Sequence, residues 1–331
     1  MNLWELTAPC HFGTEAVLKR EILDLGYDVT KVEDGRVTFQ ADAQGVADAN
    51  MFLRTTERVL LKVGEVKAET FDELFEKTKA LPWENYIPKN GKFWVAKANS
   101  IKSKLFSPSD IQSIMKKAIV ERLKGIYGIS WFPEDGPEFP IRVAFMKDIA
   151  LIRIDTSGDT TGISLHKRGY RQNTAKAPIS ETLAAALIML TPWRKDRILV
   201  DPFCGSGTFP IEAAMMAADI APGMNRHFLA ENWEHLIPKE CWEDARSTGT
   251  DQSEYRDRHS GIRYRCGSGA QCKRKCEKSR SGRTDPFPAK TGQRTASSEK
   301  VWFYHHQSAV WRASGRKSRT SGTLPADRRE L

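Results

Sequence analysis

The 331-residue sequence has no apolar run long enough to cross a membrane, and Met1-Asn-Leu-Trp-Glu lacks the basic and then apolar order of a signal peptide. Its six cysteines are scattered, at positions 10, 204, 241, 266, 272 and 276, and do not suggest a disulfide framework. These absences argue against a membrane-spanning protein and against a small disulfide-rich secreted one. They predict a cytoplasmic protein.

Excess positive charge is missing from most of the chain, although the formal net charge is +9. Residues 246–331 hold 20 of the 51 Lys and Arg residues and 8 of the 42 Asp and Glu residues, a net of +12. The first 245 residues hold the other 31 basic and 34 acidic residues, a net of −3. The basic balance of the whole chain therefore does not by itself predict RNA binding by residues 1–245.

The most informative stretch is Ile198-Leu-Val-Asp-Pro-Phe-Cys-Gly-Ser-Gly-Thr208. An apolar run ends at Asp201, glycines follow at positions 205 and 207, and residues 209–218 have the composition of a helix. Glycines let the backbone approach a ligand closely, and the helix N-terminus behind them offers unpaired N–H groups. The pattern predicts a nucleotide site at the carboxyl end of the first strand of a doubly wound α/β sheet.

Two common phosphate-binding patterns are absent from this stretch. It has no Gly-x-Gly-x-x-Gly, which disfavours a dinucleotide site, and no Lys-Ser/Thr after the glycines, which disfavours a P-loop. The Asp201 carboxylate would repel a phosphate but can accept hydrogen bonds from hydroxyls or from a cationic amino group. Residues 201–208 resemble motif I of class I S-adenosylmethionine (SAM) methyltransferases, in the form typical of nucleic-acid amino-methyltransferases. An ordinary strand, turn and helix is the alternative.

Two small α+β units are predicted before this motif. The first is a ferredoxin-like domain, assigned to residues 1–55. It is favoured by helices at 14–26 and 43–53, a hairpin of strands at 29–32 and 36–40, and a strand at 58–64. Helices at 71–81 and 108–123, a strand at 92–97 and a hairpin of strands at 141–145 and 149–154 follow. Ser107 is expected to cap the helix that begins at Pro108. This order of helix, strand, helix and hairpin resembles a THUMP domain, an RNA-binding module. It is assigned to residues 56–158.

Basic residues around the 108–123 helix are candidates for contacts with RNA phosphates, and a solvated helix face explains them equally well. They are Lys97, Lys102, Lys104, Lys116 and Lys117. In the linker before motif I, Lys167, Arg168 and Arg171 could also hold the RNA backbone, or form an exposed basic loop without that role.

Three motifs in order resemble the bacterial 23S rRNA guanine-N2 methyltransferases that carry an N-terminal THUMP domain. They are Leu165-His-Lys-Arg-Gly-Tyr-Arg171, Ala177-Pro-Ile-Ser-Glu-Thr-Leu-Ala-Ala-Ala-Leu187 and the motif I stretch. The resemblance covers about residues 1–245 and implies a Rossmann-like class I methyltransferase domain from residue 165 onward, with SAM as cofactor. It places the cofactor against Asp201, Phe203, Cys204, Gly205, Gly207, Thr208, Pro178, Glu181 and Thr182. For Glu181 and Thr182, an ordinary helix start capped by Ser180 is the alternative.

The resemblance implies RNA binding and rRNA processing, with 23S rRNA as the substrate. A tRNA substrate, or RNA binding without catalysis, are the alternatives. In the family, an Asn-Pro-Pro-Tyr loop binds the exocyclic guanine amine and places it in line with the methyl group of SAM. That loop is absent in frame from this chain, so no catalytic residue is assigned.

Aliphatic residues almost disappear after residue 245. Residues 246–331 contain only five Leu, Ile, Val or Met residues, at positions 262, 301, 310, 324 and 331. Such a segment buries too little apolar surface to offset its ordering entropy, so it is predicted to be disordered and the methyltransferase domain at 165–245 to be incomplete. Cys266, Cys272 and Cys276 lack a paired C-x-x-C and a fourth ligand, and no metal site is predicted.

The genetic code offers an explanation for this segment. Most residues of Val301–Arg312 have several synonymous codons. If suitable codons are chosen and read one base forward, they encode Tyr-Gly-Phe-Ile-Ile-Thr-Asn-Pro-Pro-Tyr-Gly, which contains the missing catalytic loop. The same shift allows residues 263–266 to encode an acid of the kind expected after the second strand. We therefore hypothesise a frameshift between about codons 243 and 250.

Overall fold

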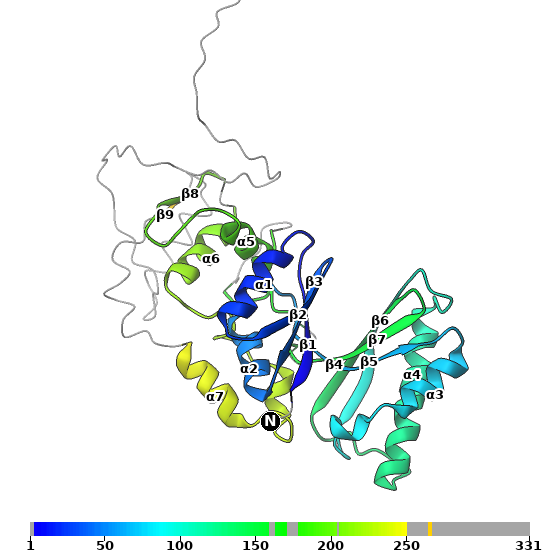
Figure 1. Ribbon diagram of the computed structural model, residues 1–331. Coiled ribbons are helices and arrows are strands. Elements are labelled where there is room, and N and C mark those ends of the chain that lie inside the picture. The colour runs from blue at the N-terminus through cyan, green and yellow to red at the C-terminus, as the bar shows by residue number, and fades with distance from the viewer. Residues whose placement is uncertain (1–2, 159–162, 171–177, 204, 250–263, 267–331) are drawn as a thin grey trace, which may run out of the picture.

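A single seven-stranded sheet organises the N-terminal half of the chain (Figure 1). The computed structural model describes residues 3–158, 163–170, 178–203, 205–249 and 264–266. The strand order is β2-β3-β1-β4-β7-β6-β5, and only β5 and β6 pair in parallel. The strands are β1 (Trp4–Pro9), β2 (Asp28–Glu33), β3 (Arg36–Ala41), β4 (Leu60–Lys67), β5 (Lys92–Ile101), β6 (Glu138–Met146) and β7 (Ile149–Asp155).

The helices of this half pack on one face of the sheet. Leu6, Leu61 and Ile154 are register partners on neighbouring strands, so their side chains share a face, and all three are buried in one core cluster. The same cluster holds the apolar sides of α1 (Glu15–Asp24), α2 (Ala43–Phe52), α3 (Phe71–Ala80), the short helix η1 (Trp83–Asn85) and α4 (Pro108–Tyr127). The opposite face of the sheet is therefore the one that can carry charge.

The ferredoxin-like and THUMP folds are confirmed. The predicted hairpins are β2–β3 and β6–β7, and Gly35 turns the first with a φ of 73°, a conformation that favours glycine. Helix α4 begins at Pro108 as expected, but the Ser107 side chain does not cap it and instead contacts the Ser109 hydroxyl. Strand β1 was not anticipated. Because β4 pairs with both β1 and β7, the two units share one sheet, and their boundary at residues 55 and 56 stays a prediction.

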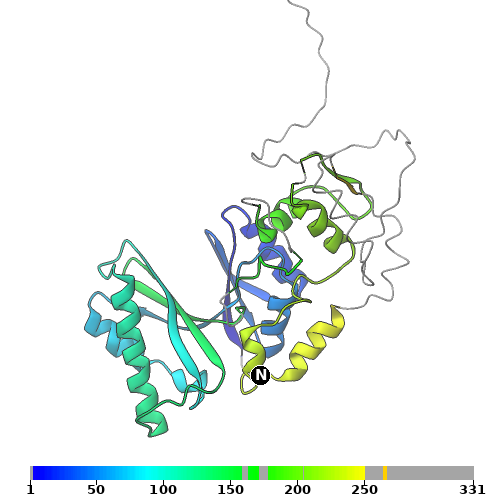
Figure 2. The same ribbon diagram turned by 180° about the vertical axis from the view of Figure 1, so that it is seen from behind.

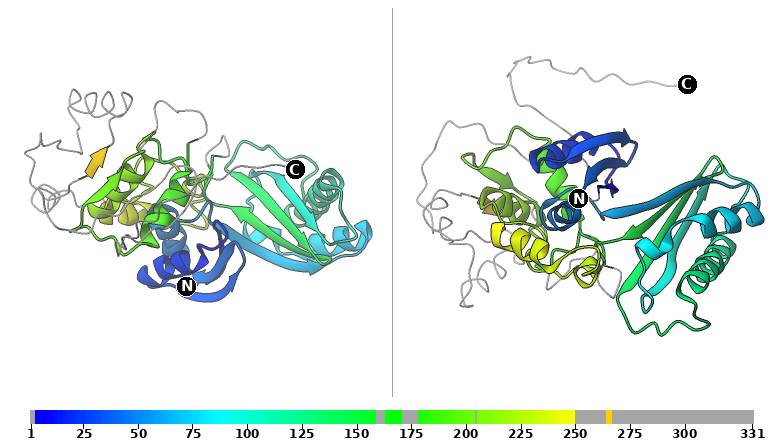
Figure 3. Two further views of the ribbon diagram at one scale, coloured as in Figure 1. Left: turned by 90° about the horizontal axis from the view of Figure 1, so that it is seen from above. Right: turned by 60° about the horizontal axis from the view of Figure 1, so that its bottom comes forward.

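A second, smaller unit follows the linker. It contains α5 (Glu181–Met189), β8 (Leu199–Asp201), α6 (Thr208–Ala217) and β9 (Tyr264–Cys266). Helices α5 and α6 pack through a core that includes Ala184, Phe209 and Ala213, beside α1 and away from α3 and α4 (Figure 3). Strand β9 pairs in parallel with β8. Residues 246–248 end α7 (Lys239–Thr248) and residues 264–266 form β9, so the expectation that residues 246–331 contain no regular structure is wrong at these two short stretches. Their remainder from residue 250 lies outside the described residues.

Residues 220–249 return to the N-terminal half, although the sequence assigns them up to residue 245 to the methyltransferase domain and the last four to the tail. This segment contains η2 (Leu229–Asn232) and α7 (Lys239–Thr248), and α7 lies beside α2 (Figure 2). Phe228, Trp233 and Trp242 belong to the large core cluster of the sheet. The Trp233 ring stacks on Phe139, with centroids 4.8 Å apart, and its indole N–H donates to the Glu138 carbonyl at 3.0 Å. We call residues 220–249 the return segment.

No helix among the residues described above is long and apolar enough to span a membrane.

Candidate cofactor site and RNA-binding surfaces

The glycine turn between β8 and α6 has the geometry that the motif predicts. Gly205 and Gly207 have φ values of 46° and 76°, in the left-handed region where a side chain would be strained. Gly207 is the N-cap of α6, and its carbonyl accepts the first helical hydrogen bond, from Ile211. The first turn of α6 therefore directs its N–H groups toward the end of β8.

Asp201 ends β8 and is almost fully buried, at 3% exposure. Its Oδ1 accepts a hydrogen bond of 3.1 Å from the Phe203 amide, which fixes the start of the turn. The Ser206 and Thr208 hydroxyls lie 2.9 Å apart and are buried, whereas Phe203 is 55% exposed. The buried carboxylate suits a ligand with a cationic amino group and hydroxyls, as SAM has. Glycines with positive φ let the backbone of the turn approach such a ligand closely. Cys204, also expected in this site, lies outside the described residues.

The segment before motif I approaches the same unit from the other side. Ser180 caps α5, accepting from the Leu183 amide at 3.3 Å, so the ordinary helix-start interpretation holds for this turn. Glu181 and Thr182 are buried, at 2% and 0% exposure, and Pro178 is partly buried. The Thr182 hydroxyl donates to the Glu57 carboxylate of the N-terminal half. Thr182 therefore ties the two halves together, and its contact with a cofactor stays a prediction.

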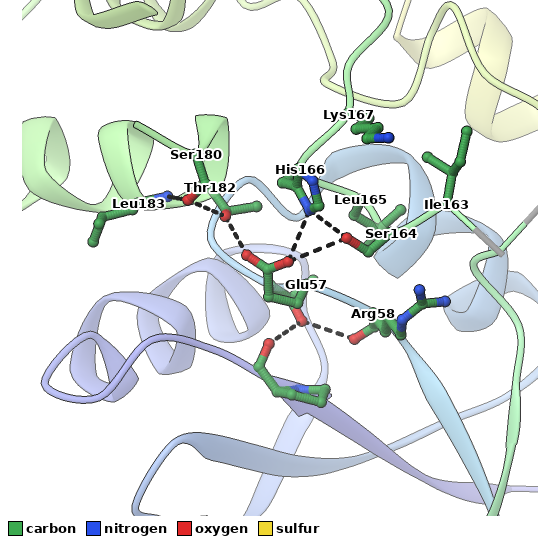
Figure 4. Close-up of polar contacts among 12 residues, drawn as sticks. Glu57, Arg58, Ile163, Ser164, Leu165, His166, Lys167, Ser180, Thr182 and Leu183 are labelled. Carbon is green, nitrogen blue, oxygen red and sulfur yellow. Dashed lines mark hydrogen bonds and ion pairs between the residues drawn. The ribbon is translucent and has the colours of Figure 1, made fainter. Parts of the chain in front are cut away.

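Glu57 is the centre of a polar cluster between the two halves (Figure 4). Besides Thr182, its carboxylate accepts from Ser164 at 3.2 Å and from His166 at 3.1 Å, and His11 lies 3.3 Å away. Burial alone would raise the pKa of Glu57, but hydrogen bonds from His166 and Thr182 and the charges of the two histidines outweigh it and lower this pKa to about 2. The cluster thus holds an ionised carboxylate between β-sheet, linker and α5. Sequence reasoning missed it, because its members are far apart in the chain.

Arg168 is buried rather than part of an exposed basic loop, which corrects the sequence expectation. It is 3% exposed, and its guanidinium donates to the carbonyls of Arg54 and Leu165 and lies 3.4 Å from the Glu212 carboxylate of α6. Tyr170 also donates to Glu212, at 2.8 Å, and burial followed by the charge of Glu212 raises the pKa of this tyrosine. The sequence suggests that Arg168 is exposed because it lies in a basic linker, and nothing near it in the sequence indicates its partner Glu212. Arg171 lies outside the described residues, and Lys167 is exposed.

The remaining RNA candidates are exposed. The ammonium groups of Lys116 and Lys117 on α4 lie 5.7 Å from the rings of Phe93 and Phe75 respectively. Lys104 pairs with Glu69. Lys97 projects from β5 and Lys102 from the loop after it. Their contact with RNA stays a prediction.

A more coherent basic surface lies on the face of the sheet opposite the helices, and sequence reasoning did not identify it. Register pairs join Lys62 to Arg153, Arg153 to Arg142, and Arg142 to Lys97, across β4, β7, β6 and β5. The alternation of charged and apolar residues in each strand was a usable signal. It could not be interpreted without the strand order, which the sequence did not establish.

Among the residues that the structure describes, no group of three or more His, Cys, Asp or Glu side chains could hold a metal ion. The cysteines at 272 and 276 lie outside that part of the chain.

Comparisons with known proteins agree with this architecture. Residues 5–60 match a family model described as the RlmL ferredoxin-like domain, residues 68–155 match the THUMP domain, and residues 168–272 match the RMKL-like methyltransferase domain. A crystal structure described as "SMU.472, a putative methyltransferase complexed with SAH" is 39% identical, with a TM-score of 0.72, over 80% of this chain and 76% of that one.

Two curated relatives are longer than this chain. "Putative RNA methyltransferase YpsC" of Bacillus subtilis is 50% identical over 257 residues, which are 77% of this chain and 65% of the relative. "Ribosomal RNA large subunit methyltransferase K/L" of Marinomonas sp. is 31% identical over 234 residues, 69% of this chain and 31% of the relative. The chain thus spans less than two thirds of either. It belongs to the family of SAM-dependent RNA methyltransferases in which RlmL ferredoxin-like and THUMP domains precede an RMKL-like methyltransferase domain.

Proposed function

We propose that this protein derives from an enzyme that transfers a methyl group from SAM to the exocyclic N2 of a guanine in 23S rRNA, in the cytoplasm. The observation that carries the proposal is the turn between β8 and α6, where buried Asp201 is followed by two glycines with positive φ, in a chain that also contains a THUMP fold. The complex of the relative SMU.472 with SAH, the demethylated form of SAM, supports the choice of cofactor.

Different residues of the turn would bind different parts of SAM. Asp201 would accept from the methionine amino group, directly or through water, and backbone amides from Phe203 to Gly207 would line the pocket. Bound SAM supplies an electrophilic methyl group. Pro178 and Glu181 lie on the approach to α5 and would close the pocket from the side of the linker. Cys204 is not proposed as a nucleophile, since no base is assigned beside it.

The frameshift hypothesis belongs to this proposal. Strand β9 occupies the place of a second parallel strand beside β8, and in a class I methyltransferase that strand ends in an acid for the ribose hydroxyls. Here it ends at Cys266, and the codons of residues 263–266, shifted by one base, can encode an aspartate. We infer that the sequence after about residue 245 is out of frame, and that the chain as written lacks the Asn-Pro-Pro-Tyr loop and does not methylate RNA.

The lack of that loop also favours a second candidate, an RNA-binding module without catalysis, while a tRNA methyltransferase is the third. Calorimetry with SAM and gel shifts with 23S rRNA transcripts and tRNA separate them. The proposal predicts SAM binding and a preference for rRNA. RNA binding without SAM binding would favour the second candidate, and a preference for tRNA the third.

A further inference from the structure

Four arginines gather on the helix-free face of the sheet, and we call them the arginine cluster: Arg36, Arg58, Arg142 and Arg153. Arg142 and Arg153 are register partners on β6 and β7. Arg58 and Arg142 both donate to Asp155, at 2.5 Å and 2.8 Å. The cluster is partly open to solvent, since the side chains of Arg36 and Arg142 are 24% and 20% exposed.

Arg153 is the member of this cluster without a counterion. It is 7% exposed, its Nε is buried without a hydrogen-bond partner, and no carboxylate in the described part of the chain forms an ion pair with it. Burial first, and then the positive charges of Arg36 and Arg142, lower the pKa of Arg153 to about 10, and the charges of Asp155 and Glu33 offset this only in part. A buried cation among like charges is costly unless an anion compensates it.

The nearby carboxylates are already engaged by other cations. Asp155 is shared by Arg58 and Arg142, and Glu33 binds Arg36 at 2.9 Å and Lys31 at 3.0 Å. A conformational change that gave Arg153 one of these acids would leave another arginine unpaired. An external anion is the simpler partner, and guanidinium groups match phosphate oxygens through paired N–H donors.

We propose that the arginine cluster binds a phosphate group of the RNA backbone, with Arg153 as its central donor. This inference rests on the proposed RNA substrate. A strand of RNA fits better than a free phosphate because the cluster continues into the basic row Lys62, Arg153, Arg142 and Lys97. Four adjacent strands spaced about 4.8 Å apart give this row a length of roughly 14 Å. Successive phosphates of a nucleic-acid strand lie closer together than this length, so the row can meet more than one.

The test compares the full chain with Arg153→Met, which keeps the length of the apolar stem and removes the charge. Arg122→Met is the matched control, because Arg122 lies on α4, behind the sheet, and has its own partner in Glu84. At constant ionic strength, inorganic phosphate should raise the melting temperature of the wild type and of Arg122→Met relative to chloride, but not that of Arg153→Met. Arg153→Lys, which keeps a cation, should retain part of the effect.

The second arm measures affinity for a 23S rRNA transcript at several salt concentrations. Arg153→Met should bind about tenfold more weakly than the wild type, and the slope of log K against log salt should fall by about one. Equal affinity and slope for the two proteins would overturn the assignment to RNA. Phosphate stabilisation that depends on Arg153 without any RNA affinity of the wild type would indicate a site for a free anion and would count against the proposed function itself. If Arg153→Met fails to fold, the absence of phosphate stabilisation in the wild type and Arg153→Lys overturns the proposal.

Discussion

Asp201 is the residue on which the cofactor assignment depends most. We predict that Asp201→Ala weakens SAM binding by about 1.5–3 kcal/mol, the contribution of a charge-assisted hydrogen bond. Asp201→Asn is the informative companion, because the amide oxygen can still accept from the Phe203 N–H while the charge is lost. Calorimetry should show weakened binding for both variants. Unchanged SAM affinity in a folded Asp201→Asn protein would remove the carboxylate from the site.

Glu57 makes the stability of the protein depend on pH. Its folded pKa of about 2 lies below its ordinary value, so its contribution to stability is present above about pH 4.5 and is lost as the pH falls toward 2. Glu57→Gln should lower the free energy of unfolding by about 1–3 kcal/mol at pH 7, and the difference should shrink between pH 4 and 2.

Chemical denaturation at several pH values measures this difference. Glu243→Gln, at an exposed position of α7, is the control and should match the wild type throughout. A Glu57→Gln deficit that stayed constant down to pH 2 would show that the carboxylate charge is not what stabilises the cluster.

Residue roles could be predicted from the sequence where the chemistry is local. The glycines at 205 and 207 and the Ser180 cap follow from short patterns, and the structure contains both. Arg168 and Thr182 could not be interpreted in this way, because their partners Glu212 and Glu57 are 44 and 125 residues away. The uncompensated charge of Arg153 is likewise a property of three-dimensional surroundings.

At the scale of elements, the return segment is the feature that ties the linker and the sheet together. The Leu229 and Ala230 amides donate to the carbonyls of Gly158 and Thr156, directly after β7. Arg226 donates to the carbonyls of Ser164 and Lys167 in the linker, at 2.7 Å and 2.9 Å. The return segment therefore holds the linker against the N-terminal half.

Trp233→Ala tests this role. Because the Trp233 side chain is fully buried and stacked on Phe139, its removal should cost about 3–5 kcal/mol of unfolding free energy. Trp131→Ala, at a tryptophan that is 80% exposed, should change stability by less than about 0.5 kcal/mol. Urea denaturation followed by circular dichroism compares the two. A loss below about 1 kcal/mol for Trp233→Ala would mean that the return segment is not part of the core.

Most elements of the first 155 residues could be predicted because their hydrophobic periods and turn residues are local. Strand β1 was missed since a short strand at the start of a chain has no preceding turn to mark it. The return segment was missed because its aromatic residues pack on strands about 90 residues earlier, as Trp233 does on Phe139. Because it follows motif I in the sequence, it was assigned to the methyltransferase domain, whereas its buried side chains pack in the core of the sheet.

At the scale of the whole molecule, two bodies of different character are joined at the Glu57 cluster. The N-terminal half has a large core and a basic row on its free face, which suits the binding of a polyanion. The unit around β8 has a small core of a few apolar residues and a glycine turn suited to SAM. Under the proposed function, the first body would bind the substrate and the second the cofactor, while permitted codons can encode the catalytic loop only out of frame.

The most direct measurement is the transfer of tritium from methyl-labelled SAM to 23S rRNA by two proteins, the chain as written and the product of the same gene read with one base shifted after about codon 245. The account predicts that the shifted protein labels the N2 of a guanine in 23S rRNA, while the chain as written transfers no label above background. Equal rates for the two proteins, or label on tRNA and none on rRNA, would contradict it.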